Sequence, residues 1–424
     1  MKNMKKRIIA LILAAIVAAA AIALGGCADD SPNGGEITEA PAAAEPAPEV
    51  EPDPEIEAEP EPEPELLEIP DFITIQGEQF STWLTELDLR DRQLRAEDIE
   101  PLRYMVNLTY LNLIFNAQIR DISALAGLTN LTELWLTDTG VSDLTPLAGL
   151  TNLDRLMIGG NQISDISPLA GLSNLRDLAI ANNRISDIGP LAGMTNLIQL
   201  NAHTNDISDL SPLAGLSNLN HANLITNNIS DLSGLAGLTD MVDLRLQENQ
   251  ISDLSPLAGL TNLEVLNLSG NQIGDLSPLA GLTNLTELIL HENQISDLSA
   301  LAGLPNLESL GLANNQISDI SPIEELSNLT ELFLHANQIS DISALAGLSS
   351  LERLNLWDNQ ISDIGALAGL PNLDLLLLRG NQISDVSVLV ELSNLTFVNL
   401  EENPVPGVQI AELRRALPGA EIWR

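Results

Sequence analysis

The chain has few of the residues on which compact domains and active sites usually depend. Its 424 residues include one cysteine, four histidines and 11 aromatic side chains. A single cysteine excludes an internal disulfide and a cysteine-rich zinc site. So few rings argue against several ordinary globular cores, because such cores rely on bulky aromatic side chains. The apolar content is mostly leucine, isoleucine and alanine, which suits a repetitive core.

Basic residues and catalytic motifs are also scarce. The chain has 18 basic and 59 acidic residues, a formal net charge of −41. We expect no nucleic-acid partner, because such binding draws its affinity from neutralised phosphates. The sequence contains no Gly-x-Ser-x-Gly elbow, phosphate-binding loop or His-Glu-x-x-His motif. We therefore expect neither enzymatic activity nor a cofactor.

Residues 1–27 have the pattern of a secretory signal. Four basic residues precede an apolar stretch over residues 8–24, which ends in Leu24-Gly25-Gly26-Cys27. This end is similar to the bacterial lipobox, and the resemblance implies that Cys27 is lipidated and anchors the chain in a membrane. The alternative is an uncleaved membrane anchor, although 17 residues is short for a span.

Both interpretations place the rest of the chain outside the cytoplasmic membrane. We expect a bacterial cell-surface protein, lipid-anchored to the outer side of that membrane. In a cell with two membranes the outer membrane is the alternative, because Ala28 stands where a retained lipoprotein usually has Asp.

Residues 28–70 form an acidic segment with 15 carboxylates, 10 prolines and no basic residue. Such a composition cannot bury enough apolar surface to offset the entropy of ordering. We predict a disordered, extended tether that spaces the following domain from the membrane. A plain solubilising linker is the alternative.

The rest of the chain is a repeat. A leucine recurs every 22 residues from Leu131 to Leu395, with Met241 as the one substitute, and two less regular units begin at Leu84 and Leu108. A fixed period of this length with repeated leucines is typical of leucine-rich repeats. No unit can bury its leucines alone, so stability must come from stacking.

The leucine spacing within one unit indicates the fold of every unit. Leu288 and Leu290, two residues apart, indicate a short strand with both side chains inward. The later steps of three residues suit a 3₁₀ turn. We predict an α/β solenoid, a leucine-rich-repeat horseshoe of fifteen units, with a parallel sheet on the concave face and 3₁₀ turns on the convex face. Residues 108–403 form the solenoid, between helical end caps at 71–107, which includes the first irregular repeat, and 404–424.

Two polar columns accompany the leucines. An asparagine recurs from Asn161 to Asn403, and we expect its amide to bond turn backbone that the strands do not reach; Arg92 and Thr139 interrupt this column. An aspartate follows in each unit, for example Asp253, and we expect it to cap the 3₁₀ turn. A calcium column is the alternative, although the glycine-rich calcium-binding pattern is missing.

The repeat Leu-x-x-Leu-x-Leu-x-x-Asn-x-Ile-Ser-Asp-Ile-Ser-Pro-Leu-Ala-Gly-Leu-Thr-Asn resembles the 22-residue repeat of bacterial internalins and covers about residues 84–405. The resemblance implies a right-handed horseshoe that binds a protein ligand on its concave face. This sequence departs from the family in having no immunoglobulin-like domain and no sorting signal after the repeats. We therefore expect a surface lipoprotein and do not carry over host-cell invasion.

Outward positions of the strands carry the functional signal. Six aromatic residues and all four histidines occupy them, and exposed apolar patches usually mark interaction sites. The alternative is that these residues only pack on one another along the sheet. We expect the ligand-binding face to comprise Ile289, His291, Phe333, His335, Arg353, Trp357, Leu375, Leu377, Arg379 and Phe397. A weaker second patch comprises Tyr110, Phe115, Trp135 and Met157.

A shared metal ion is the competing interpretation of the histidines. His203 and His221 differ by about four positions along their strands, and His291 and His335 lie two strands apart, roughly 10 Å. Both separations are too wide for shared coordination, so we expect no metal site.

Residues 71–424 keep a net charge of −30 from 44 acidic and 14 basic side chains, which leaves weak association with divalent cations open.

The sequence thus predicts a monomer that recognises an unknown protein or peptide without catalysis. A glycan- or cell-wall-binding adhesin is the alternative, because aromatic rings also stack on sugars. A purely structural spacer is a third hypothesis.

Ala202 and Ala222 replace inward leucines in adjacent units, which predicts either a local weak point or bend, or a neutral change.

Overall fold

The computed structural model describes residues 69–424. The predicted signal segment, Cys27 and the tether up to residue 68 lie outside the described residues. Within residues 69–424, no helix combines the length and the apolar character needed to cross a bilayer.

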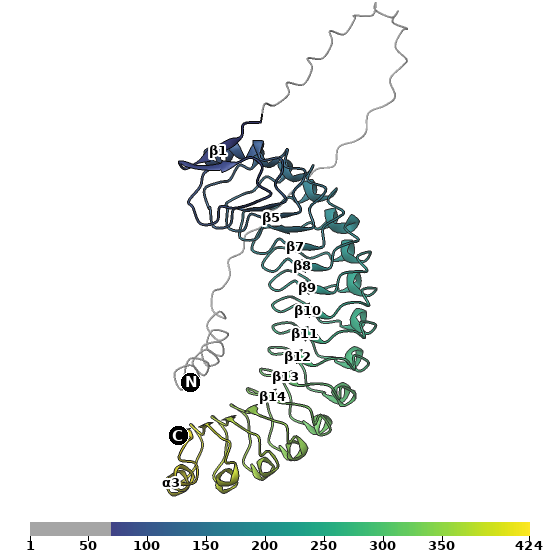
Figure 1. Cartoon of the computed structure of the whole chain (residues 1–424). Coiled ribbons are helices and arrows are strands. Elements are labelled where there is room, and N and C mark those ends of the chain that lie inside the picture. The colour runs from purple at the N-terminus through teal and green to yellow at the C-terminus, as the bar shows by residue number, and fades with distance from the viewer. Residues whose placement is uncertain (1–68) are drawn as a thin grey trace, which may run out of the picture. The chain divides into compact units, whose positions relative to one another are not determined.

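The repeats build one curved parallel sheet, and the predicted leucine-rich-repeat solenoid is confirmed (Figure 1). Sixteen strands pair strictly in chain order, from β3 to β18. The fifteen predicted units supply β3 to β17, and the C-terminal segment adds β18. The strands are β3 (Glu86–Asp88), β4 (Tyr110–Asn112), β5 (Glu133–Trp135), β6 (Arg155–Met157), β7 (Asp177–Ala179), β8 (Gln199–Asn201), β9 (His221–Asn223), β10 (Asp243–Arg245), β11 (Val265–Asn267), β12 (Glu287–Ile289), β13 (Ser309–Gly311), β14 (Glu331–Phe333), β15 (Arg353–Asn355), β16 (Leu375–Leu377), β17 (Phe397–Asn399) and β18 (Glu421–Trp423).

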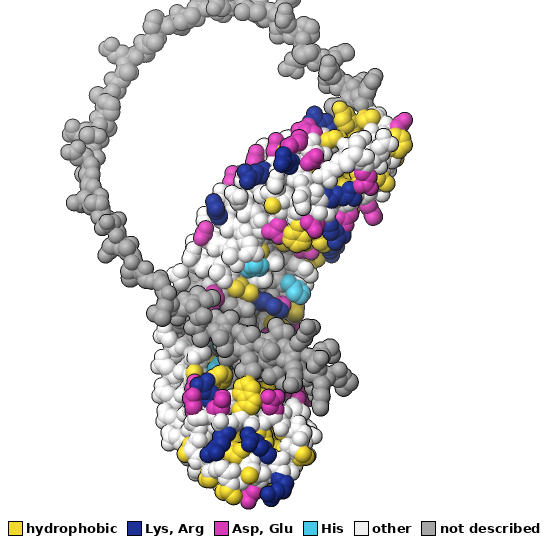
Figure 2. All heavy atoms as spheres, turned by 90° about the vertical axis from the view of Figure 1, so that its left-hand side faces the viewer, with side chains coloured by type: hydrophobic (Ala, Val, Ile, Leu, Met, Phe, Trp, Pro, Cys, Tyr) yellow, Lys and Arg dark blue, Asp and Glu magenta, His cyan; other side chains and the backbone are white. Residues whose placement is uncertain are grey.

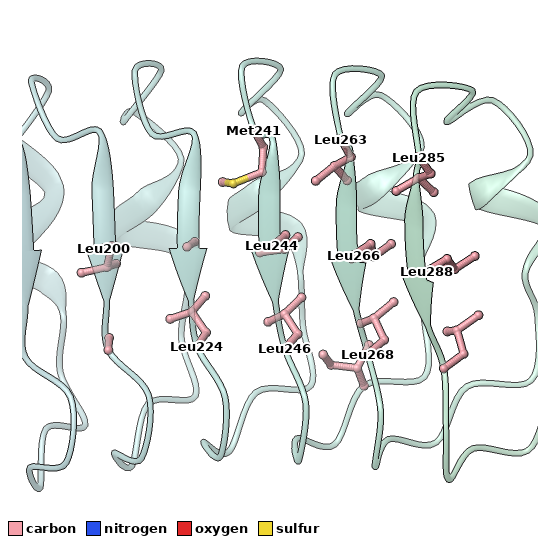
Figure 3. Packing of buried hydrophobic residues seen from close by; sticks show 14 of the residues in the cluster. Leu200, Leu224, Met241, Leu244, Leu246, Leu263, Leu266, Leu268, Leu285 and Leu288 are labelled. Atoms are coloured by element: carbon pink, nitrogen blue, oxygen red, sulfur yellow. The ribbon is translucent and has the colours of Figure 1, made fainter. Parts of the chain in front are cut away.

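The register of the sheet stacks equivalent leucines into rows. Leu244 pairs with Leu266, and Leu266 with Leu288. All three side chains are fully buried, and the close-up shows the same row continuing across neighbouring strands (Figure 3). Each coil therefore buries its leucines against the coils before and after it, which is why the repeat is stable only as a stack.

Short 3₁₀ turns follow the strands on the other side of each coil. They are η2 (Ser123–Leu125), η3 (Thr145–Leu147), η4 (Ser167–Leu169), η5 (Gly189–Gly193), η6 (Ser211–Leu213), η7 (Ser233–Leu235), η8 (Ser255–Leu257), η9 (Ser277–Leu279), η10 (Ser299–Gly303), η11 (Ser321–Ile323), η12 (Ser343–Gly347), η13 (Gly365–Gly369) and η14 (Ser387–Glu391). The predicted aspartate caps are present. Asp209 accepts hydrogen bonds from the Ser211 backbone N–H at 2.8 Å and the Ser211 hydroxyl at 2.9 Å. These bonds lower the pKa of Asp209.

The predicted asparagine column is also confirmed. Asn271 donates through Nδ2 to the Leu246 and Leu268 carbonyls, both at 3.0 Å, and its Oδ1 accepts the Ile251 N–H at 2.9 Å. Thr139 interrupts the column as expected, and its hydroxyl donates to the Leu136 carbonyl at 2.7 Å.

The two ends of the solenoid are closed differently. The N-terminal end is covered by an antiparallel hairpin, β1 (Phe72–Ile75) and β2 (Glu78–Ser81), followed by the one-turn helix α2 (Ala96–Ile99) and the 3₁₀ helix η1 (Glu100–Tyr104). The prediction of a helical cap is therefore wrong in part at this end, because a hairpin supplies the buried Ile73 and Ile75. At the other end α3 (Gly407–Ala416) is the expected helix.

Candidate ligand-binding face

Three outward positions of each coil line the concave face. They are the first and third residues of each strand and the residue two places after it. Seen from this side, charged, hydrophobic and histidine side chains gather along the concave strip, whereas the visible flanks are largely uncharged polar groups and backbone (Figure 2). Apolar, charged and histidine side chains thus lie side by side on the concave face.

The C-terminal half of this strip carries a continuous row of rings. The His291 and His335 ring centroids are 6.1 Å apart, and the His335 ring lies 6.5 Å from the ring of Trp357. The guanidinium carbon of Arg379 lies 5.2 Å above the Trp357 ring, within the range of a cation–π contact. Phe333 meets His291 edge-on at 6.2 Å. We call His291, Phe333, His335, Trp357 and Arg379 the ring row.

A gap in the intervening strand brings the two histidines together. β13 presents only Gly311 and Ala313 between them, so the His291 ring leans across this strand. A Cβ on Gly311 would lie 2.6 Å from the His291 ring, closer than real Cβ contacts allow. The separation of roughly 10 Å expected from strand spacing is therefore wrong for the rings. Even so, residues 69–424 contain no group of three or more His, Cys, Asp or Glu residues placed to hold a metal ion.

Both histidines of the row are held in one orientation. His291 Nδ1 accepts the Ala313 backbone N–H at 3.0 Å, and His335 Nδ1 lies 3.0 Å from the Asn355 side-chain amide nitrogen. Burial lowers the pKa of each to about 4, and for His291 the neighbouring His335 adds to this effect. The rings are thus neutral near pH 7, and each offers an Nε2–H donor.

The charged members of the face are partly neutralised. Arg353 is ion-paired with Glu331, and Arg379 with Glu402. Nevertheless, Arg379 Nε is buried and makes no hydrogen bond in the described structure. A buried donor without a partner is costly, so a shift of this side chain that exposed Nε would be favoured.

Three expected contact residues are not exposed. Leu375, Leu377 and Phe397 are 8%, 4% and 1% exposed and form a small apolar cluster of their own. Trp423 of β18 packs on Phe397 with ring centroids 5.0 Å apart, because the sixteenth strand extends the sheet over this end. The expectation of exposure is wrong for these three, and here the alternative of mutual packing holds. Ile289 and Arg353 remain partly exposed beside the ring row.

The second patch is only partly assembled. Tyr110 and Trp135 are in ring contact at 6.3 Å, and Trp135 is the strand partner of Met157. Phe115 is 58% exposed but stands in the turn after β4, at φ 61°, rather than on a strand.

The structure also contains a hollow that the sequence interpretation missed. Its volume is about 310 Å³, and it opens on the concave face over β6 to β10. The sequence signal is a run of small outward residues on consecutive strands, Ala179, Asn201 and Asn223. The buried Ala202 and Ala222 do not interrupt the sheet, because β8 to β10 pair without a register break. The hollow is lined by Met157, Asp177, Ala179, Gln199, Leu200, Asn201, His221, Ala222, Asn223, Asp243 and Arg245.

Comparison with known families gives one match. A profile described as leucine rich repeats (2 copies) matches nine stretches, which form two overlapping runs. They are residues 106–149, 129–171, 151–193, 173–215, 240–281, 261–303, 283–325, 305–347 and 327–369. A comparison with curated proteins gives no match.

Solved structures give many similar folds. An internalin of Listeria monocytogenes, InlF, is 33% identical over 82% of this chain and 89% of its own, with a TM-score of 0.59. A leucine-rich-repeat protein of Leptospira interrogans is 24% identical over 80% of this chain and 83% of its own, with a TM-score of 0.67. The plant peptide hormone receptor RGFR1, solved with RGF2, is 23% identical over 76% and 56%, with a TM-score of 0.65. The last two show the fold alone.

Proposed function

Because the chain belongs to the leucine-rich-repeat family and carries internalin-like repeats, we propose that it recognises a protein or peptide on its concave face. In this proposal the chain catalyses no reaction. The observation that carries it is the ring row, a set of partly buried rings in contact with one another on the concave face. The plant receptor solved with its peptide supports the same use of this fold in a distant relative.

The ring row has the composition of a binding hot spot. Trp and Arg are enriched at such sites, where they sit among residues that exclude water. Trp357 and Arg379 are already stacked, so little side-chain entropy remains to be lost on binding.

The decisive test compares two variants of the full chain. Phe333→Ser/Trp357→Ser removes the centre of the row, whereas Val408→Ser removes an apolar side chain that is 65% exposed on α3. Both are immobilised and exposed to envelope and surrounding material. A ligand held by wild type and Val408→Ser but lost from the double variant, and then weakened about tenfold or more with purified components, supports the proposal.

Equal capture by both variants, with unchanged circular dichroism, would rule out the ring row as the recognition site. Retention on peptidoglycan or chitin that free oligosaccharide competes away would favour the glycan-binding alternative, which the planar rings also suit. Tolerance of every soluble substitution in the row, with no ligand at all, would favour a structural spacer.

We further propose that the chain is displayed at the cell surface through lipid on Cys27. The similarity of its repeats to an internalin supports a surface location, and the Leu24-Gly25-Gly26-Cys27 motif supports the lipid. Labelling with radioactive palmitate tests this. We expect label on wild type and none on Cys27→Ser, and label on both would contradict the proposal.

A further inference from the structure

The hollow over β6 to β10 is separate from the ring row. Its floor is made of Ala179, Asn201 and Asn223, and Met157 and Arg245 stand at its two ends. Arg245 is turned toward Asp243 of its own strand, with Nε–Oδ1 and Nη2–Oδ2 distances of 3.0 Å. Its charge is therefore satisfied within the protein, and the rest of the hollow is open to a ligand.

The hollow is lined by two carboxylates, Asp177 and Asp243, and by three side-chain amides. Asn201 Oδ1 accepts no hydrogen bond but is buried, so a ligand would reach it only after the amide turns. His221 Nδ1 lies 2.5 Å from the Asn220 side-chain oxygen, to which it donates. Asp177 uses only Oδ2, which accepts from Arg155 Nε at 3.1 Å. Burial raises the pKa of Asp177 despite that contact, so its carboxylate lacks compensation for lost solvent.

The apolar part of the hollow suits an aliphatic stem. Met157 and Ala179 adjoin Asp177, and Met157 continues toward Trp135 of the second patch. Lysine and arginine pack their methylene stems on apolar surface while a cationic head seeks acceptors. The guanidinium group of arginine has five N–H donors and could bind acceptors on neighbouring strands at the same time.

We propose that this hollow receives a basic side chain, arginine or lysine, of the recognised protein or peptide. The inference rests on the proposed use of the concave face, but it involves none of the residues of the ring row. Charge complementarity supports it at long range, because residues 71–424 carry a net charge of −30 and attract a basic partner to the protein.

Ligand-observed saturation-transfer NMR on the full chain tests this with defined probes. The probes are the blocked pentapeptide Gly-Gly-Arg-Gly-Gly, its lysine analogue, and its citrulline analogue, which keeps the length of arginine but has no charge. We expect saturation of the arginine or lysine methylenes to exceed that of citrulline about fivefold, and the excess to fall in high salt. Equal saturation of all three would overturn the proposal.

Variants locate the contact. Asp177→Asn removes the negative charge of the carboxylate, and Ala179→Leu fills the floor while keeping every charge. Either should abolish the excess saturation. Glu287→Gln, the same kind of change in the same row on β12 but outside the hollow, should leave it intact. Excess saturation that survives both hollow variants would refute the site. Phe333→Ser/Trp357→Ser should keep the excess, so failure of the ring row and failure of the hollow are separable.

Discussion

Each interior asparagine joins neighbouring coils through both ends of its amide. Asn271 donates to carbonyls of its own coil and of the preceding one, and it accepts an N–H from the preceding one. Because these turn groups have no strand partner, the amide satisfies backbone that would otherwise be buried unpaired. The side chain is only 8% exposed, so water cannot replace it.

We expect Asn271→Ala to lower the free energy of unfolding by about 3 kcal/mol, because several buried polar groups lose their partner. Asn262→Ala is the matched control. Asn262 is exposed and donates one bond, to the Thr239 carbonyl at 2.9 Å, so its loss should cost about 0.5–1 kcal/mol. Chemical denaturation followed by circular dichroism measures both. Similar losses for the two variants would contradict a special role for the column.

At the scale of elements, β13 determines the geometry of the ring row because it has no bulky outward side chain. Gly311 leaves room for the His291 ring to cross the strand and reach His335. A row of contacts therefore spans β12 to β16, and β13, its second strand, contributes no ring. The same principle applies to the hollow, where small residues on β7 to β9 leave space rather than fill it.

We expect Gly311→Val to expel the His291 ring and to raise the pKa of His291 from about 4 toward its usual value near 6.5. With a folded-state pKa below the unfolded one, neutral His291 contributes stability that is complete above about pH 6.5 and is lost as the pH falls toward 4. The variant should therefore lose less stability than wild type over this window. NMR titration of the imidazole resonances measures the shift.

Gly281→Ala is the control for this change, because a Cβ there meets nothing within 4 Å. Its His291 resonance should titrate as in wild type. An unchanged pKa in Gly311→Val would show that the ring is held by contacts other than the gap.

The spacing of residues in the sequence predicts every element that depends only on one coil and its neighbours in the repeat. The strands, the leucine rows, the asparagine column and the aspartate turns all follow from the 22-residue repeat pattern, because each depends on residues one coil apart. The burial of Phe397 could not be predicted in this way. It depends on Trp423, which belongs to no repeat and reaches the sheet only through β18. The His291–His335 contact depends on a missing side chain at Gly311.

At the scale of the whole molecule, each described coil contacts mainly its two neighbours, and stability is approximately a sum of coil and interface terms. The ring row and the hollow lie on one sheet, but β11 separates them. The distance between the two candidate sites is therefore set by the number of coils, at about 4.8 Å each.

We expect deletion of residues 263–284, one whole period containing β11 and η9, to leave a folded solenoid. The deletion places β10 beside β12 with leucine rows matched. Circular dichroism and gel filtration should show a compact protein, and the arginine pentapeptide should still bind the hollow. Deletion of 11 residues, half of the repeat, is the control, and it should unfold the chain because inward and outward positions no longer align. If the whole-period deletion unfolded the chain, the stability of the solenoid would not be a sum of coil and nearest-neighbour terms.

The unbroken 22-residue period also has a consequence for inheritance. Neighbouring repeats that encode nearly the same residues can recombine out of step, and an exchange of this kind removes or adds 22 codons without changing the reading frame. Each product keeps both end caps and a continuous core. The gene can therefore lengthen or shorten the reach of the concave face in single steps, and selection on a new partner can act on proteins that already fold.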